Sequence, residues 1–288
     1  MLAAEVVSFL EPRPDGLYVD CTIGLGGHTA ALLAAGGGRV IGMDRDPRAL
    51  TFAETRLADA AGRVEFVHDD YRNLAAVLRA RGLARVDGIV GDLGVSSLQL
   101  DDPARGFSFR HAGPLDMRMD PTRGESLADR LARVDEASLA DVIWRLGEER
   151  HSRRVARAVI AARDRGELTD TGALAAAVRR AAGRGGWQRI DPATRTFQAL
   201  RLWVNDELDG LDGFIETAAA LLAARGRLAL IAFHSLEDRV VKHTMRRLTG
   251  EGSGLRLVTR RPVVPGEAEQ SRNPRSRSAR LRVLERAA

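Results

Sequence analysis

Short apolar runs alternate with helical patterns over the first hundred residues, and this alternation restricts the fold more than any other feature. The apolar runs, each interpreted as a strand, lie at 17–21, 39–44, 63–68 and 86–92. The helical patterns between them lie at 27–35, 47–60 and 73–82. Strands that alternate with helices form parallel sheets whose faces are both covered. We therefore predict an α/β fold with a Rossmann-like sheet.

The alternation stops after residue 92. The segment 93–125 is rich in Gly, Pro, Asp and Ser, and an irregular loop of this length is usually functional. Residues 126–183 carry only helical patterns, and a longer helical pattern follows with a break expected near Gly210 or Gly213. Strand patterns return at 226–233, 255–260 and 279–285. We predict a sheet domain at 1–100 and 196–288, interrupted by an all-α insertion domain at 101–195.

Composition excludes several classes of protein. No apolar run approaches the roughly 20 residues of a membrane helix, and the N-terminal stretch, which carries Glu5, does not resemble a signal peptide. Cys21 is the single cysteine, which excludes an internal disulfide framework and a cysteine-rich zinc site. The six histidines show no metal-ligand spacing. We expect a cytoplasmic protein that uses neither a membrane nor a metal.

The glycine-rich stretch VDCTIGLGGHTA at 19–30 has the form of a nucleotide-binding loop. Asp20 ends the first strand, Gly24 and Gly26 follow it, and Asp44 ends the second strand 18 residues after Gly26. An NAD-binding turn has a third glycine where this chain has Thr29. An acid four residues before G-x-G is instead the first motif of S-adenosylmethionine (SAM) methyltransferases, in which an acid such as Asp44 accepts both ribose hydroxyls. We predict SAM, with NAD as the alternative.

Two further features point to a functional edge of the sheet and to RNA. Asp92 ends the fourth strand, where ligands bind in such sheets, although an Asx turn with Gly94 is the structural alternative. The formal charge is +5, and the segment 271–282 has five arginines and no acid. Arginine matches phosphate geometry, so this segment is a candidate RNA contact, or else a solvated tail.

Longer motifs resemble one family closely, the bacterial small-subunit rRNA cytosine-N4 methyltransferases, or methyltransferase H family. They run in order between about residues 17 and 286, and are DCTIGLGGH, GMDRDP, DGIVGDLGVSSLQLDDPARGFSF, GPLDMRMDPTRG, TRTFQALRLWVNDEL, FHSLEDRVVK and NPRSRSARLR. One departure is that the family opens with a segment such as H-x-P-V-L-L, whereas this chain begins close to Glu5. This difference indicates a start that is truncated or assigned late.

The resemblance implies a class I SAM-dependent methyltransferase that acts on the exocyclic N4 of a cytidine in 16S rRNA, at the decoding centre of the small ribosomal subunit. The insertion would then recognise RNA, and the oligomeric state, a homodimer included, is left open. The residues that the resemblance assigns to SAM are Gly26, Gly27, His28, Asp44, Tyr71, Asp92 and Gln99. Tyr71 is a candidate for stacking on the adenine.

Cytosine N4 is a poor nucleophile, so we expect direct in-line attack on the SAM methyl group, helped by an acceptor for the N4 hydrogens. Asp92 and Asp116 are the candidate acceptors. In FHSLEDR we expect Ser235 to cap the following helix together with Asp238, and to form the floor of the cytidine pocket with His234. His234 is equally well interpreted as a core histidine. The candidate stacking partners for the flipped base are Phe107, Phe109 and Trp187.

Two other functions remain open from the sequence. The first is a SAM-dependent methyltransferase that acts on a different RNA or on a small molecule. The second is a SAM-binding regulator without catalytic activity. The helical insertion and the excess of arginine argue against a small-molecule enzyme, and the acceptor candidates argue against a regulator.

Overall fold

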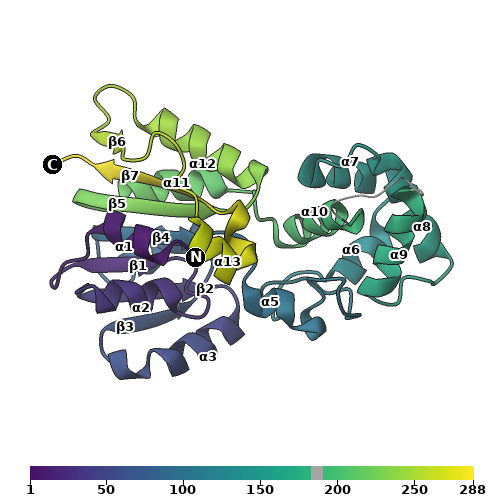
Figure 1. The fold of residues 1–288 in the computed structure, drawn as a ribbon, viewed down its shortest axis with the longest axis horizontal. Coiled ribbons are helices and arrows are strands. Elements are labelled where there is room, and N and C mark those ends of the chain that lie inside the picture. Colours follow the sequence, from purple (N-terminus) through teal and green to yellow (C-terminus); the bar gives the residue numbers. More distant parts are fainter. Residues whose placement is uncertain (183–190) are drawn as a thin grey trace. The chain divides into compact units, whose positions relative to one another are not determined.

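The computed structural model describes residues 1–182 and 191–288, which form two units (Figure 1). Unit 1 comprises Met1–Gly94 and Leu208–Ala288, and unit 2 comprises Val95–Glu207. Each unit has its own hydrophobic core. The second unit is therefore an insertion in the first along the chain.

Unit 1 is built on a seven-stranded sheet with the order β3-β2-β1-β4-β5-β7-β6. Strands β1 to β5 are parallel, while β7 is antiparallel to both β5 and β6. The strands are β1 (Leu17–Asp20), β2 (Arg39–Asp44), β3 (Val64–His68), β4 (Val86–Asp92), β5 (Leu222–Ala232), β6 (Leu255–Leu257) and β7 (Arg280–Arg286). The predicted α/β fold is confirmed, and most residues of the central strands β1, β2 and β4 are buried.

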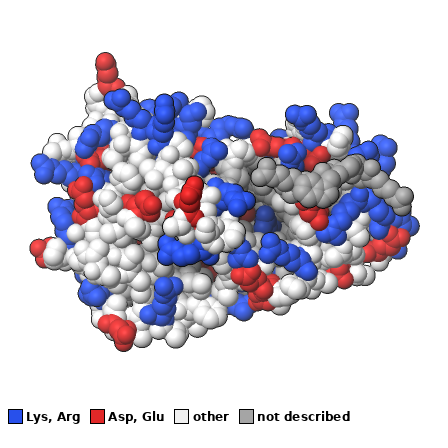
Figure 2. Space-filling model, in the orientation of Figure 1, with Lys and Arg blue, Asp and Glu red and all other residues white. Residues whose placement is uncertain are grey.

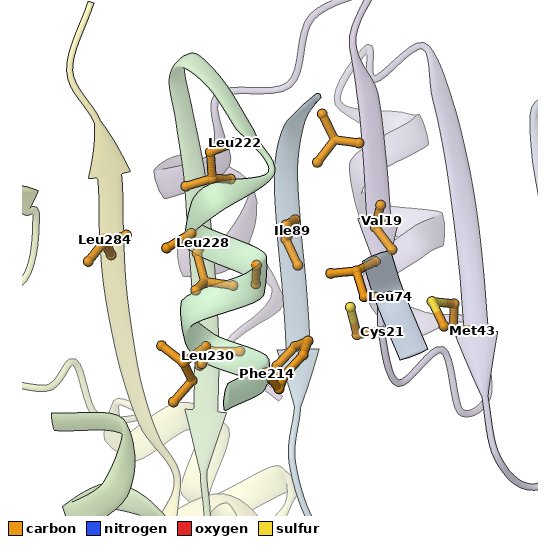
Figure 3. Packing of buried hydrophobic residues seen from close by; sticks show 14 of the residues in the cluster. Val19, Cys21, Met43, Leu74, Ile89, Phe214, Leu222, Leu228, Leu230 and Leu284 are labelled. Atoms are coloured by element: carbon orange, nitrogen blue, oxygen red, sulfur yellow. The ribbon is translucent and has the colours of Figure 1, made fainter. Parts of the chain in front are cut away.

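The side chains of these strands alternate between two cores on opposite faces of the sheet. Val19, Ile89 and Leu228 pack into one core (Figure 3), whereas their neighbours Val90 and Ala229 pack into the other. The helices of unit 1 are α1 (Ala3–Leu10), α2 (Gly27–Ala34), α3 (Pro47–Arg56), α4 (Leu74–Arg79), α11 (Leu211–Ala220), α12 (Ser235–Leu248) and α13 (Glu267–Arg272). Residues of α4, α11 and α12 line the first core, and residues of α1 and α2 line the second.

The arginine-rich segment 271–282 is not a solvated tail. It contains a short 3₁₀ helix at Pro274–Ser278 and then enters β7 in the middle of the β5-β7-β6 ladder. Arg282 is buried and donates to Asp238, and Arg280 donates to the same carboxylate. Two of the five arginines are therefore neutralised within the protein. On the face drawn in Figure 2, basic and acidic side chains are interspersed.

Unit 2 consists mainly of helices packed around a separate core. The helices are α5 (Ser97–Asp101), α6 (Leu127–Arg133), α7 (Glu136–Gly147), α8 (Ser152–Asp164), α9 (Thr171–Ala182) and α10 (Ala193–Asn205). Phe197 and Leu200 of α10 are buried in this core, so α10 belongs to unit 2, whereas the sequence places the end of the insertion at 195. The long helical pattern breaks near Gly210 as predicted: α10 ends at Asn205, and Gly210, with φ of 72°, is the N-cap of α11.

The irregular segment before α6 is held by the side chain of Asn205 at the end of α10. Its Oδ1 accepts from the Met119 amide at 2.7 Å, and its Nδ2 donates to the carbonyls of Met117 at 2.8 Å and Arg201 at 2.9 Å. Met117 lies at φ of 61°, a left-handed conformation that needs such support. The motif GPLDMRMD is thereby fixed in shape by a residue far along the chain.

We expect Asn205→Ala to destabilise unit 2 by about 2–4 kcal/mol, because buried backbone groups of the Met117 segment lose their partners. All three tryptophans, at 144, 187 and 203, fall within the range of unit 2, so tryptophan fluorescence during urea unfolding reports on this unit. The control Asn73→Ala removes an exposed hydrogen bond in unit 1 and should leave that transition unchanged. Equal midpoints for the two variants would contradict the proposed support.

Among the described residues, no helix has both the length and the apolar character that crossing a bilayer requires.

Candidate active site at the carboxyl ends of the parallel strands

The glycine loop between β1 and α2 is shaped by left-handed backbone conformations. Gly24 and Gly26 lie at φ of 51° and 74°, a region that favours glycine. A Cβ on Gly26 would also meet the Leu57 side chain at 2.9 Å, whereas a Cβ on Gly27 would meet nothing within 4 Å. The loop therefore packs closely against α3 at Gly26 and leaves space at Gly27, where α2 begins.

Asp20 holds this loop from inside. Its side chain is fully buried, Oδ2 accepts from the Thr29 hydroxyl at 2.8 Å, and Oδ1 accepts from the Thr22 amide at 3.3 Å. Burial raises the pKa of Asp20, although the nearby His28 and these hydrogen bonds act in the opposite direction. The acid of the sequence motif thus ties β1 to the first turn of α2.

Asp44 connects the glycine loop with the start of α3. One carboxylate oxygen accepts from the Gly24 amide at 2.9 Å, and the other accepts from the Asp46 amide at 2.9 Å. Burial raises the pKa of Asp44 to about 6, even though both amides favour its ionised form. Asp44 as a whole residue is half-buried, and its carboxylate oxygens keep lone pairs for a ligand.

Asp92 and His28 form the polar centre of the site. Their closest atoms, His28 Nε2 and Asp92 Oδ2, are 3.5 Å apart and do not have hydrogen-bonding geometry. Within the described part of the chain, neither ring nitrogen of His28 nor Oδ1 of Asp92 has a hydrogen-bond partner, although these atoms are buried. The Asp92 amide donates to the Thr22 hydroxyl at 2.6 Å, which fixes the end of β4 beside the loop. Buried polar atoms without partners indicate a place for a ligand.

The FHSLEDR motif has a different arrangement from the predicted one. His234, not Ser235, is the N-cap of α12, since its Nδ1 accepts from the Glu237 amide at 3.4 Å. Ser235 is the first helical residue, and Asp238 pairs with Arg282 and Arg280 instead of capping. The Ser-x-x-Asp pattern places the N-cap at Ser235, whereas the helix begins at Ser235 and its N-cap is one residue earlier.

Glu237 was not selected by the sequence analysis, yet it lies buried behind His234. Its Oε2 accepts from the Phe233 amide at 2.9 Å, and its Oε1 lies 3.1 Å from His234 Nε2. A Cβ on Gly94 would come within 3.3 Å of Oε1, so Glu237 also borders the end of the β4 region. The only sequence signal for this role is its place three residues after His234.

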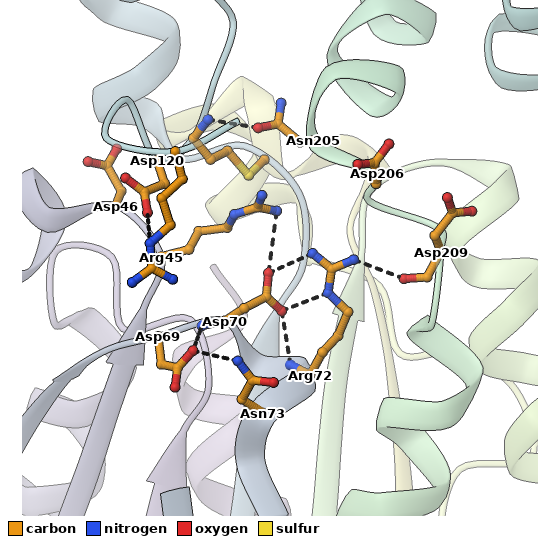
Figure 4. Close-up of polar contacts among 12 residues, drawn as sticks. Arg45, Asp46, Asp69, Asp70, Arg72, Asn73, Asp120, Asn205, Asp206 and Asp209 are labelled. Atoms are coloured by element: carbon orange, nitrogen blue, oxygen red, sulfur yellow. Dashed lines mark hydrogen bonds and ion pairs between the residues drawn. The ribbon is translucent and has the colours of Figure 1, made fainter. Parts of the chain in front are cut away.

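Tyr71 lies just beyond β3, in a short 3₁₀ helix at Tyr71–Asn73, and its ring packs against Phe214 at 4.6 Å between centroids. Asp70 beside it accepts from Arg72 and pairs with Arg45 at 3.7 Å (Figure 4). Burial opposes ionisation of Asp70, but the Arg72 hydrogen bonds outweigh it and lower its pKa. The Tyr71 ring is thus held between the core and an ionic pair.

Several predicted site residues belong to unit 2. Gln99 is buried, and its Oε1 accepts from the Ser96 amide in a capping box of α5. Asp116 is bound through both oxygens to Arg118, at 2.7 and 2.8 Å. Burial opposes its ionisation, but these bonds prevail and lower the pKa of Asp116.

The stacking candidates of unit 2 have different surroundings. Phe107 is fully buried, which favours a core residue over a stacking partner for the base. Phe109 is half-buried and packs edge-on against Phe197 at 4.8 Å. Trp187 lies outside the described residues.

A glycine loop after β1, an acid at the end of β2 and Asp92 at the end of β4, on a largely parallel seven-stranded sheet, define a class I SAM-dependent methyltransferase. The model of the MraW methylase family matches residues 1–287, and the chain belongs to this family. The cofactor of the family is SAM. The predicted family and cofactor are therefore confirmed.

Curated relatives agree with this assignment over nearly the whole chain. The ribosomal RNA small subunit methyltransferase H of Sorangium cellulosum is 51% identical over 286 residues, which cover 99% of this chain and 90% of the relative. The protein of the same name from Rhodopseudomonas palustris (strain TIE-1) is 49% identical over 299 residues, covering 99% and 90%. That from Paramagnetospirillum magneticum is 46% identical over 304 residues, covering 100% and 95%.

Proposed function

We propose that this protein transfers the methyl group of SAM to the exocyclic N4 of a cytidine in 16S rRNA, at the decoding centre of the small ribosomal subunit, in the cytoplasm. The names of the relatives support the small-subunit rRNA as substrate, and the motif resemblance supports the N4 position. The observation that carries the chemistry is the buried, unpartnered Oδ1 of Asp92 at the end of β4. Such an oxygen can accept a hydrogen from an amino group.

The residues of unit 1 fit SAM. The open space at Gly27 admits the methionine part beside the glycine loop, and Asp44 offers lone pairs to the two ribose hydroxyls. The half-buried Tyr71 offers an aromatic edge for the adenine. Gln99, which belongs to unit 2, is proposed as a cofactor contact by family resemblance alone. When bound, SAM supplies a methyl group already activated on a sulfonium.

We expect SAM binding to weaken in mildly acidic solution, because a protonated Asp44 accepts fewer hydrogen bonds from the ribose. Burial raises the pKa of Asp44 to about 6, so its carboxylate is mostly ionised at pH 7 and mostly protonated at pH 5. The Kd should rise about tenfold between these pH values. Isothermal calorimetry of wild type and Asp44→Asn measures this. The variant should bind weakly at both pH values, and a pH response equal to that of wild type would refute the role of Asp44.

The remaining catalytic candidates are less suited to accept a proton. His234 Nδ1 accepts from the Glu237 amide, so the neutral ring carries its proton on Nε2, which lies 3.1 Å from Glu237 Oε1 and has no hydrogen-bond partner among the described residues. Nε2 is therefore a donor and not a base in this arrangement. We propose that it orients the base or ribose through the Nε2 side. Ser235 follows His234 as the first residue of α12. The Asp116 carboxylate is already paired with Arg118. Asp92 therefore remains the acceptor for the N4 hydrogen.

The proposal is tested by transfer of labelled methyl from SAM to small ribosomal subunits and to free 16S rRNA from cells that lack the modification. The RNA is digested and the labelled nucleoside identified. Label in N4-methylcytidine supports the proposal. A faster reaction with subunits than with free RNA would show that methylation follows assembly of the subunit. Label in another nucleoside, or in small molecules alone, would show that the methyl acceptor is not cytidine N4. SAM binding without any transfer indicates the regulator.

A further inference from the structure

His28 is buried beside the half-buried Asp92, and both have buried polar atoms without a hydrogen-bond partner among the described residues. We propose that His28 takes up the proton that methyl transfer releases, so that its imidazolium replaces the positive charge of the sulfonium in the site. This inference rests on the proposed methyl transfer to an amino group and assigns the final proton acceptor within the same site. A carboxylate oxygen of Asp92 first accepts the proton from the amine and then passes it to His28.

The surroundings of His28 support this role. The side chain is 8% exposed, both of its nitrogens are buried, and neither has a hydrogen-bond partner among the residues that the structure describes. Asp92 Oδ2 lies 3.5 Å from Nε2. A neutral imidazole has one nitrogen that accepts a proton, and this nitrogen is not occupied here.

The charges around His28 come from three directions. The Asp92 carboxylate, at the end of β4, lies 3.5 Å from Nε2, and the buried Asp20, at the end of β1, interacts with His28 electrostatically. His28 is also the second residue of α2, so it lies at the positive end of the helix dipole. The sulfonium of a bound SAM would add one further charge to this set.

That further charge changes during the reaction. The N4 lone pair forms the new N–C bond while the C–S bond breaks and its electron pair stays on sulfur. The sulfonium becomes a neutral thioether, and N4 carries an extra proton. The proton passes to Asp92 and then to His28. The site therefore holds one positive charge beside its buried carboxylates before and after transfer, which avoids an uncompensated buried anion.

Charge compensation predicts a difference between two ligands that needs no RNA. S-adenosylhomocysteine lacks the sulfonium charge of SAM but is otherwise the same molecule. Its binding should draw a proton onto His28, and binding of SAM should not. Calorimetric titrations near pH 7, in buffers with different ionisation enthalpies, measure the protons taken up. We expect wild type to take up more with S-adenosylhomocysteine, the difference approaching about one proton.

The variant His28→Gln keeps a polar side chain that does not titrate in this range, and should lose most of the difference. The ligands' own ionisation is common to both proteins, so it cancels in the comparison. His243→Gln, which changes an exposed histidine of α12, is the matched control and should behave as wild type. Circular dichroism confirms folding, and His28→Asn replaces His28→Gln if that variant unfolds.

Two results would overturn the proposal. The first is equal proton uptake for both ligands in the wild-type protein, which needs no variant. The second is a difference that survives unchanged in a folded His28 variant. Because no acceptor is present, these results are independent of whether cytidine N4 is the substrate. In turnover, His28→Gln should lower kcat about 10²-fold.

Discussion

Asp92→Asn is expected to lower kcat for methyl transfer by roughly 10³-fold, within the range that a positioned proton acceptor contributes. The amide keeps the size of the carboxylate but cannot take the N4 hydrogen, and its NH₂ group would face the amine with a donor. The Asp92 backbone bond to Thr22 does not depend on the side chain, so the end of β4 should keep its position. The defect should therefore appear in kcat more than in KM for the RNA.

Single-turnover assays with small subunits and saturating SAM measure this loss directly. Asp87→Asn is a matched control at the opposite end of β4, where the carboxylate bonds to Arg13 and to the Leu17 amide. It should transfer methyl at nearly the wild-type rate. An Asp92→Asn protein with more than about a tenth of wild-type kcat would exclude Asp92 as the acceptor, since that loss falls below the effect of general base catalysis.

Asp238→Asn is expected to destabilise unit 1 by about 3–5 kcal/mol, the usual effect of breaking a buried ion pair on one side. The Asp238 carboxylate on α12 accepts from Arg282 Nε at 2.7 Å and from Arg280 Nη1 at 3.0 Å, both on β7. Its loss leaves the Arg282 guanidinium buried without an anion. The helix and the antiparallel strand are then no longer joined by this ionic contact.

Amide hydrogen exchange in β7 measures this change in unit 1 alone. Global unfolding would combine the transitions of the two units in one curve. Protection in β7 should fall, while protection in the helices of unit 2 should be retained. Asp141→Asn is the control, because its pair with Arg145 is exposed and contributes less than about 1 kcal/mol. Unchanged protection of β7 in Asp238→Asn would show that the ion pair does not stabilise the strand.

The same pair makes the stability of unit 1 depend on pH. Burial disfavours the Asp238 anion, but hydrogen bonds from Arg282 and Arg280 outweigh burial and lower its pKa below 3.8. The folded state therefore binds this proton less readily than the unfolded state. The stabilisation is present above pH 3.8 and is lost as pH falls through the lower folded pKa. Asp238→Asn should flatten that part of the acid unfolding curve.

Local patterns predicted most of the regular structure correctly. The apolar runs ending at Asp44 and Asp92 became β2 and β4 with the predicted bounds. The helix start at Ser235 was predicted less well, because a histidine ring can cap a helix and the Ser-x-x-Asp pattern conceals it. The interpretation of 271–282 as an RNA contact or a tail overlooked Asp238, since a pairing across 44 residues leaves no local signal.

The sequence alone determined the alternating α/β sheet, the glycine loop after the first strand and the family, because each depends on local spacing or on motifs. Only the tertiary structure decided that Asp20 faces inward to Thr29, that Asn205 supports the Met117 segment, and that Asp92 and His28 meet with buried, unpartnered atoms. These arrangements join residues from separate strands and helices. Their distances arise from packing of the whole chain, which no spacing along the sequence specifies.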